Sequence, residues 1–413
     1  MSPLSPKQWW LVRQARAGKP DWDRLKTEVF PTHPDVFTEL FRAAGRGVPK
    51  AYKRAAQAPV NEQAVFFESN LGKQYTGNPR YIYERMLQTH PDWTYFWSYN
   101  GDPSVIPGNP IVFPRSSEAY ATHAAEARYL VNNTVLRMWF HRPESFYLQT
   151  WHGTPYKLMH WDRTLNPIER RSSPDFWVKS RGWDALLSPN AHSSQVFRTA
   201  FRYDGPILDF GYPANDIFYD PDRYAGVRSR LRAQLSIDAG APVYLYAPTW
   251  RDDGHLGGQM YRFDLLLDVD DFLAHAPAGA VLLVRAHHMS AAEGELAALP
   301  EGVIDVSHFD DATELMCAAD TLITDYSSIV FDWACSRKPV IYWVPDIDHY
   351  TNALRGSYFS LDEINAGPVC RTPAELHTAL SSTPTPYDTF YERFCSFHDG
   401  HSTTRLLEYL LSQ

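Results

Sequence analysis

The residues best suited to chemistry lie where short apolar runs of this sequence end. His152 follows the run 147–151 and stands beside Gly153, whose missing side chain would let a substrate approach closely. An imidazole at such a place can act as a general base, and it can equally be structural. Lys157 and Asp162 follow within reach, and Asp162 could either orient the imidazole or cap a helix.

Cationic side chains follow two later apolar runs. Arg251 comes after the segment 248–250, and its guanidinium suits bidentate phosphate recognition or an ordinary ion pair. Arg285 and His287 alternate after the run 281–284, so both project to the same side and would suit a diphosphate. A weaker cluster, which we expect in a loop over the site, comprises Tyr350, Arg355 and Gly356.

The segment 321–332 has the pattern of a buried strand, a tight turn and a helix start. Its apolar run ends in Thr324 and Asp325, and two hydroxyls, Ser327 and Ser328, precede the next apolar-periodic stretch. Unpaired N–H groups and the helix dipole would favour an anion such as phosphate there. The alternative is that one of the two serines serves only as a helix cap.

The elements that must position these residues alternate along the chain. Strand-like runs and helical patterns follow each other in two similar series, divided near 212–240, which predicts parallel sheets covered by helices. The expected strands are 64–68, 93–99, 110–113, 129–131, 147–151, 186–188, 207–210, 243–247, 281–284, 322–323 and 340–343. The expected helices are 21–30, 35–44, 81–88, 116–127, 193–201 and 312–319, with further helices starting near 5 and 329.

Length and composition point to a soluble globular protein of two domains. The 413 residues exceed what one hydrophobic core usually holds, and the chain is 44% hydrophobic and 21% charged. No run approaches the length of a membrane span, and because the N-terminal residues lack an apolar core followed by a cleavage site, we expect no signal peptide. The four cysteines lack the close pairing of a disulfide scaffold or zinc site, so we expect a reducing, cytoplasmic location.

The predicted domains are a basic helical arm (1–60) and two α/β domains (61–215 and 216–413). The arm has eleven Lys or Arg against five Asp or Glu, although the whole chain has a net charge of −9. Trp9, Trp10 and Trp22 interrupt this basic segment. Such a composition suits peripheral contact with anionic lipid, and it also suits an arm packed on the main body with a solvated basic face.

Several common site signatures are missing from the sequence. It has no GxxxxGK-S/T loop and no GxGxxG fingerprint, which argues against P-loop nucleotidases and dinucleotide dehydrogenases. It also lacks HExxH, and we expect none of its DxD-like acidic pairs to hold a metal. We therefore expect no metal, no cofactor and no nucleic-acid partner.

Taken together, the motifs resemble the CDP-glycerol glycerophosphotransferase family of teichoic acid primases and polymerases. The resemblance spans residues 64 to 410 and leaves out the basic arm. It rests on Phe67-Glu68-Ser69, Asn78-Pro79, Trp151-His152-Gly153-Thr154-Pro155 with Lys157 and Asp162, Gly211-Tyr212-Pro213 with Asn215-Asp216, Pro248-Thr249-Trp250-Arg251, Arg285 with His287, Thr324-Asp325-Tyr326-Ser327-Ser328 with Phe331-Asp332, Arg355-Gly356 and Asp399-Gly400. Two positions depart from the family pattern: Ala214 replaces the usual arginine, and His288 replaces a common proline.

The resemblance implies an α/β, GT-B-like fold in which two Rossmann-like domains face each other across a cleft. The N-terminal Rossmann-like domain (61–215) would then be the acceptor domain and the C-terminal one (216–413) the nucleotide-donor domain. Its members transfer glycerol phosphate from CDP-glycerol to a hydroxyl of a membrane-linked polymer and release CMP; relatives use CDP-ribitol or build capsules. His152 would then be the base and Asp162 its orienting group, and His287 would protonate the departing phosphate. The implied substrate-binding residues are Gly153, Thr154, Lys157, Arg251, Arg285, Thr324, Asp325, Ser327, Ser328 and Asp332.

Two other functions fit the same features. A GT-B glycosyltransferase using a nucleotide sugar would need the same fold, because fold alone does not determine function. A non-enzymatic module that binds surface polymers is the second, although a degenerate site would be expected to lose one of His152 and His287. The nucleotide that the protein releases would separate these alternatives.

Overall fold

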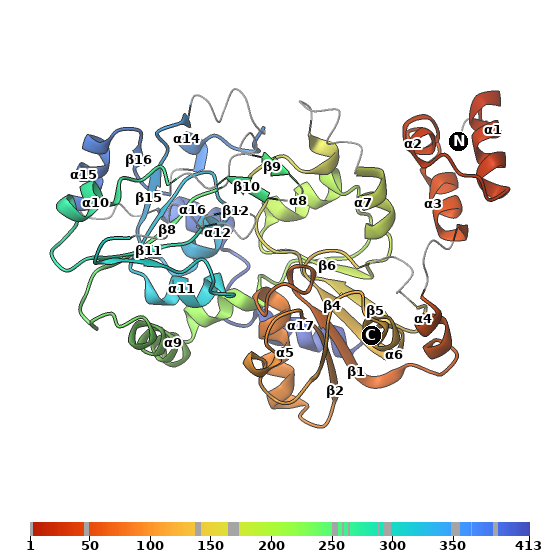
Figure 1. Ribbon diagram of the computed structural model, residues 1–413, viewed down its shortest axis with the longest axis horizontal. Coiled ribbons are helices and arrows are strands. Elements are labelled where there is room, and N and C mark those ends of the chain that lie inside the picture. Colours follow the sequence, from red (N-terminus) through yellow and green to blue (C-terminus); the bar gives the residue numbers. More distant parts are fainter. Residues whose placement is uncertain are drawn as a thin grey trace.

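The computed structural model contains two α/β units and a group of N-terminal helices (Figure 1). It describes residues 3–44, 49–136, 142–163, 173–249, 255–257, 260–262, 265–286, 290–291, 299–347, 356–364, 366–382 and 387–413. Of the predicted site residues, Arg251 and His287 lie outside these ranges, as do Tyr350 and Arg355. Within them, no helix combines the length and the hydrophobicity that a bilayer crossing requires.

The first unit is built on a seven-stranded parallel sheet with the order β3-β2-β1-β4-β5-β6-β7. The inner strand β1 is buried on both faces over its last five residues, since Phe66 belongs to the apolar cluster on one side and Phe67 to that on the other. The strands are β1 (Asn61–Glu68), β2 (Thr94–Ser98), β3 (Ile111–Phe113), β4 (Ala127–Asn132), β5 (Phe146–Gln149), β6 (Ala185–Leu187) and β7 (Ile207–Leu208).

The second unit repeats this architecture with six parallel strands in the order β13-β11-β8-β14-β15-β16. These are β8 (Val243–Ala247), β11 (Val281–Val284), β13 (Val303–Asp305), β14 (Thr321–Thr324), β15 (Val340–Trp343) and β16 (Val369–Cys370). A small separate sheet contains β9 (His255–Gly257), β10 (Met260–Arg262) and β12 (Ser290–Ala291). The two large sheets confirm the predicted α/β class with two Rossmann-like domains.

Helices cover both large sheets, and many begin at a side-chain cap, such as Asn190 for α8 and Asp220 for α9. The first unit has α5 (Gly77–Thr89), α6 (Glu118–Glu126), α7 (Ser173–Ser180) and α8 (Ala191–Ala200), with short turns η2 (Asn70–Gly72), η3 (Pro103–Val105), η5 (His160–Asp162) and η7 (Pro213–Tyr219). The second has α9 (Pro221–Gln234), α10 (Val269–His275), α11 (Ala312–Ala318), α12 (Ile329–Ala334), α14 (Leu361–Ile364), α15 (Pro373–Ser381) and α16 (Asp388–Phe394).

The last helix, α17 (Ser402–Leu411), returns to the first unit (Figure 1). Leu406 and Leu410 are buried in the same cluster as Phe67, on one face of the N-terminal sheet. The predicted range 216–413 for the second domain therefore includes a helix that packs in the first. The sequence pattern could not predict that α17 packs on the first unit, because the periodicity of an amphipathic helix does not specify which sheet the helix covers.

The predicted arm 1–60 also has two parts. α4 (Lys50–Ala55) packs against α6, and its Tyr52 shares an apolar cluster with Phe66, so it belongs to the first unit. The remainder, α1 (Pro6–Arg16), α2 (Trp22–Arg24), η1 (Leu25–Val29) and α3 (Pro34–Ala43), forms its own small core. This core docks on α7, where Phe30 meets Trp177 edge to face at 5.2 Å. The arm is therefore packed on the main body.

Candidate active site

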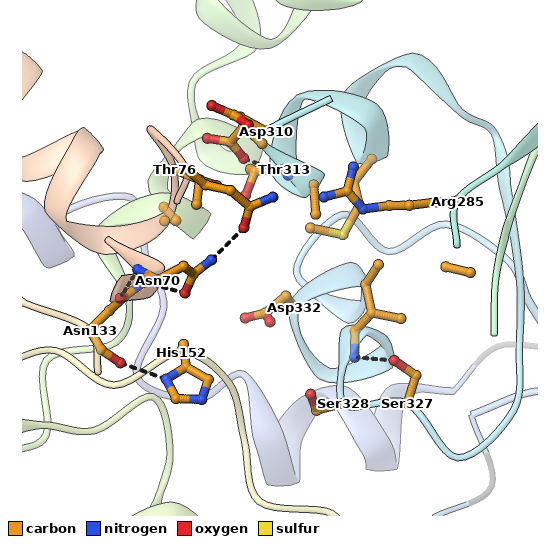
Figure 2. Close-up of a pocket in the computed structure, with 18 of the residues that line it drawn as sticks. Asn70, Thr76, Asn133, His152, Arg285, Asp310, Thr313, Ser327, Ser328 and Asp332 are labelled. Atoms are coloured by element: carbon orange, nitrogen blue, oxygen red, sulfur yellow. Dashed lines mark hydrogen bonds between the residues drawn. The ribbon is translucent and has the colours of Figure 1, made fainter. Parts of the chain in front are cut away.

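The carboxyl ends of the two large sheets border a cavity of about 320 Å³ (Figure 2). This is where parallel α/β sheets bind ligands. Its lining comes from both units and includes Asn70, Gln74, Asn78, Asn133, His152, Asn215, Arg285, Asp310, Asp311, Ser327, Ser328 and Asp332. A second cavity of about 300 Å³ shares Trp151, His152, Ser327 and Ser328 with the first. His152 and the serine pair therefore lie between two spaces, each large enough for a small substrate.

His152 follows β5 and is held in one ring orientation. Its Nδ1 lies 2.5 Å from the backbone carbonyl oxygen of Asn133, and its ring stacks on Trp151 with centroids 4.3 Å apart. Because a carbonyl can only accept, Nδ1 carries the proton and donates it. Nε2, on the far side of the ring from Asn133 (Figure 2), then has the lone pair of a base.

The protonation state of His152 suits that role. Protein atoms around the ring lower the pKa of His152 below its ordinary value by desolvation, while the Asn133 carbonyl acts in the opposite direction. The ring is therefore neutral near pH 7, although it remains open to the cleft. A neutral imidazole can take a proton from an attacking hydroxyl.

The backbone around His152 allows the two units to approach closely. Trp151 has a φ of 54° and Gly153 a φ of 145°, both in the region that non-glycine residues rarely adopt. A Cβ on Gly153 would stand 3.1 Å from the Ser328 hydroxyl of the second unit. Glycine is thus required at position 153, where the loop that carries His152 meets the start of α12.

Asp162 does not orient His152. Its Oδ2 accepts hydrogen bonds of 2.7 Å from the hydroxyls of Thr199 and Tyr358, and the Asn133 carbonyl takes its place at Nδ1. The expectation was wrong because η5 carries Asp162 toward α8 and the segment after residue 356. Asp162 therefore tethers the loop that borders the second cavity.

Three more predicted binding residues have structural contacts of their own. Thr324 is buried and donates to the Ala247 carbonyl at 2.8 Å, which joins the ends of β14 and β8. Asp325, also buried, accepts from the backbone and hydroxyl of Thr249. Thr154 accepts from Asn190 inside the first unit. None of Thr324, Asp325 and Thr154 lines the larger cavity, whereas Thr154 lines the smaller one.

Ser327, Ser328 and Asp332 do line the larger cavity, at the start of α12. The Ser327 hydroxyl accepts from the Ile329 N–H at 3.4 Å, whereas Ser328 makes no side-chain cap. Burial raises the pKa of Asp332 to about 6, although Asn215 donates to it at 2.9 Å and lowers the pKa. Asp332 can therefore exchange a proton near neutral pH.

Arg285 also lines the cavity, and Lys157 lines the smaller one. The Arg285 guanidinium donates to the Phe309 carbonyl at 2.7 Å, and burial lowers the pKa of Arg285 while Asp311 and Asp310 raise it. Lys157 pairs through its backbone with Ser357. Arg285 is thus fixed at the wall of the larger cavity, where Figure 2 shows it facing the interior.

The amide side chains that line the first unit's side of the cavity were not among the predicted site residues. Asn133 follows β4 and pairs with Asn70, whose N–H donates to it at 2.8 Å. Asn78 accepts from the Ala214 N–H at 3.2 Å, so the position that departs from the family pattern is part of the wall. The rule that ligands bind at strand ends could have indicated Asn133, which comes directly after β4.

Two groups of charges join the units at one side of the cavity. Arg80 of α5 contacts Asp311 at 3.1 Å and Glu314 at 2.7 Å. Asp310 accepts 3.0 Å hydrogen bonds from the Tyr75 N–H and the Tyr99 hydroxyl. These contacts hold the cleft closed on that side.

Among the described residues, one group of side chains is close enough to share a metal ion. Asp271, His275 and His377 have ligand atoms within 4.8 Å of one another, on α10 and α15. Their rings stack at 3.5 Å and only 9° apart, so both imidazole lone pairs cannot meet at one ion without ring rotation. This group is not part of either cavity.

Comparison with known proteins places these features in a family. A family model described as CDP-Glycerol:Poly(glycerophosphate) glycerophosphotransferase matches residues 50–412. The chain is 34% identical to the teichoic acid poly(glycerol phosphate) polymerase of Bacillus subtilis (strain 168) over 379 residues, covering 87% of this chain and 50% of that protein. It is 30% identical to the teichoic acid glycerol-phosphate transferase of Staphylococcus aureus (strain NCTC 8325 / PS 47), covering 86% of this chain and 95% of that protein.

The chain thus spans about half the length of the first relative and nearly all of the second. A solved structure of the wall teichoic acid polymerase TagF, a variant soaked with CDPG, matches with a TM-score of 0.79 and 29% identity. It covers 93% of this chain and 98% of the solved one. The predicted resemblance is confirmed: the chain belongs to the CDP-glycerol:poly(glycerophosphate) glycerophosphotransferase family.

Proposed function

We propose that the protein transfers glycerol phosphate, or a related polyol phosphate, from its CDP-activated form to a hydroxyl of a teichoic-acid-like polymer. The observation that carries this proposal is the geometry of His152, a neutral base fixed between two cavities at the meeting of the two units. Membership of the family supports the substrate class.

In the proposed reaction, the acceptor hydroxyl attacks the distal phosphorus of the CDP-polyol. A new bond forms from the hydroxyl oxygen to that phosphorus, and the bond from the phosphorus to the CMP oxygen breaks. His152 Nε2 takes the hydroxyl proton, which lowers the barrier because an alkoxide need not form in water. The Asn133 carbonyl stabilises the imidazolium that results.

The donor would lie against the second unit. Arg285, Ser327 and Ser328 face the shared space and offer a cation and two hydroxyls to a diphosphate. Arg251 and His287 remain predicted contributors, with His287 as the acid that protonates CMP. With these cations we propose that no divalent metal is required.

The N-terminal helices would keep the enzyme near a lipid-linked acceptor. Trp9 and Trp10 on α1 are 55% and 51% exposed, an unusual state for large aromatic side chains. Arg13 lies over Trp9 at 5.6 Å and Arg24 over Trp10 at 5.8 Å. Exposed tryptophans with neighbouring cations suit the headgroup region of an anionic bilayer, so we propose a peripheral contact through α1.

A nucleotide-release assay tests the proposed function. The protein is incubated with CDP-glycerol, CDP-ribitol and several nucleotide sugars, each with a glycerol phosphate oligomer as acceptor. CMP release from a CDP-polyol, dependent on the acceptor, is the expected result. Turnover of a nucleotide sugar alone would instead identify a glycosyltransferase, and binding without turnover of any donor would identify a polymer-binding module.

A further inference from the structure

A buried carboxylate lies beneath the active site, and neither the motifs nor the proposed mechanism gives it a role. Glu68 is the last residue of β1 and is fully buried. It accepts hydrogen bonds from Ser98 at the end of β2, from Asn132 at the end of β4 and from Arg115 after β3, at 2.8, 2.8 and 2.5 Å. One side chain therefore ties together the ends of the strands that lead to the cleft.

The contact with Asn132 extends to the turn that follows β4. The Asn132 side-chain oxygen accepts from the Thr134 N–H at 2.6 Å, and its backbone carbonyl accepts from the Thr150 N–H at 2.9 Å. Gln149 donates to the Thr134 carbonyl and accepts from the Trp151 N–H. The turn 132–134 and the segment 149–151 are thus locked to each other and to Glu68.

The only residue between these anchors is Asn133, whose carbonyl holds His152 Nδ1. Its side chain is fixed as well, because its amide pairs with Asn70 in both directions, at 2.8 and 3.2 Å. A displacement of the turn would move the carbonyl, since the carbonyl has no freedom of its own. His152 could then exchange its tautomer and lose the lone pair at Nε2.

We infer that Glu68, through Asn132, is a positioning residue that fixes the tautomer and the orientation of His152. The inference rests on the proposed function, in which His152 is the base. Glu68 itself contacts no substrate in the proposed mechanism. It holds the Asn133 carbonyl in place, and that carbonyl orients the His152 imidazole.

A carboxylate suits this position better than a neutral side chain. All three partners of Glu68 donate hydrogen bonds, and an ionised carboxylate has only acceptor sites. None of the three donors therefore faces another donor on Glu68. Burial raises the pKa of Glu68, and Arg115, Ser98 and Asn132 lower it, with Arg115 supplying the compensating charge. The network is therefore satisfied only when the turn stands where it does.

The test is the variant Asn132→Ser in the full-length protein. A serine hydroxyl can still accept from the Thr134 N–H, but it is too short to reach Glu68. Histidine-selective 15N NMR reports the tautomer of His152, whose signal is identified by its loss in His152→Ala. We expect the wild type to show the Nδ1–H form and Asn132→Ser a mixture of both forms.

The kinetic readout is CMP release. A misplaced base should lower kcat about 10- to 100-fold and leave the KM for the donor unchanged, because the donor contacts lie in the other unit. Glu68→Gln should keep the wild-type tautomer and most of kcat. Its side-chain carbonyl can still accept from Asn132 and Arg115, while its amide faces the Ser98 hydroxyl.

The matched control is Ser145→Ala. Ser145 is buried at the amino ends of β4 and β5, away from the cleft, and donates to the Ala127 carbonyl at 2.8 Å. Its loss should cost similar stability without moving the His152 signal or kcat. If Asn132→Ser is recovered unfolded, Glu68→Asp, which withdraws the carboxylate by one methylene, is measured in the same way.

A folded Asn132→Ser or Glu68→Asp protein with the wild-type tautomer and kcat would overturn the inference. So would an equal shift in Ser145→Ala, which would show a general effect of lost stability. If the wild type released CMP from no CDP-polyol, the proposed function would fail, but the NMR comparison would still decide whether Glu68 positions His152.

Discussion

The two large sheets direct their strand ends into the same cleft, yet they supply it with different chemistry. The first unit offers neutral amides and one imidazole. Its buried carboxylate, Glu68, is paired with Arg115 and does not line the cavity. The second offers charged side chains and a pair of hydroxyls at the lining itself, namely Arg285, Asp310, Asp311, Asp332, Ser327 and Ser328. Under the proposed function, deprotonation of the acceptor hydroxyl would belong to the first unit and charge compensation of the donor to the second, so each could be altered without the other.

The largest effect should come from His152→Ala. Removing a general base typically costs a factor of about 100 to 10,000 in rate, so kcat for CMP release should fall by that amount. Donor affinity should change little, because the donor contacts lie across the cleft. Turnover and equilibrium binding of CDP-glycerol are measured side by side, with His401→Ala, an exposed histidine at the start of α17, as the control. Full activity in His152→Ala would remove the assignment of the base.

The contacts between the two units provide the next test. Arg80→Met leaves Asp311 buried without its cation, and breaking a buried ion pair costs about 3–5 kcal/mol. The free energy of unfolding, measured in urea at pH 7, should fall by this amount. The exposed pair Arg54 and Glu118 within the first unit is the control, since Arg54→Met should cost less than about 1 kcal/mol. Equal losses of unfolding free energy in Arg80→Met and Arg54→Met would show that the interdomain ion pair stabilises the fold no more than an exposed pair does.

Asp332 should make the second unit sensitive to pH. Burial raises the pKa of Asp332 from 3.8 to about 6, so the folded state binds a proton that the unfolded state has released between these values. The stabilisation from that proton is complete below pH 3.8 and is lost as pH rises through 6. Asp332→Asn should therefore gain stability relative to the wild type between pH 4 and 7, by roughly 2 kcal/mol.

The comparison for Asp332 is Asp399 on the protein surface. A hydrogen bond from Arg405 lowers the pKa of Asp399, so its contribution is present at neutral pH and lost as pH falls. Asp399→Asn should show a smaller pH trend of opposite sign, because the side chain is exposed. Urea unfolding at several pH values measures both, and parallel trends in the two variants would contradict the assignment for Asp332.

The smallest effect on the enzyme itself is expected at the N-terminal helices. Replacing Trp9 and Trp10 by serine should weaken binding to anionic vesicles about tenfold and leave CMP release from a soluble acceptor unchanged. Val105 and Ile111 are exposed to a similar extent, 52% and 48%, in the first unit, and serine there should leave vesicle binding as it is. Flotation with vesicles distinguishes the pairs; unchanged flotation of the tryptophan variant would dismiss the membrane contact.

Much of the fold could be predicted because the signals are local. β8, β11 and β15 match the predicted ranges 243–247, 281–284 and 340–343, since buried parallel strands read as short apolar runs. The short strands β9, β10, β12, β13 and β16 were not predicted, because two or three residues give no period to detect.

The site was predicted unevenly for a related reason. His152, Gly153, Ser327, Ser328 and Asp332 do meet in one place, because parallel strands bring their carboxyl ends to one edge. Thr324 and Asp325 belong to the same motif, but they point into the fold and hold neighbouring segments. A motif shows which residues lie at a strand end, and the packing of the next strand decides which of them reach the cleft.

The sequence by itself therefore determined two α/β units, the family, and the strand ends that carry the candidate chemistry. These follow from local periodicity and from motifs whose spacing can be recognised in the sequence without knowledge of the fold. Only the tertiary structure decided that the Asn133 carbonyl, and not Asp162, fixes His152, and that α17 returns to the first unit. The reason is that hydrogen-bond partners and helix docking depend on segments brought together from far along the chain, at distances that no local pattern encodes.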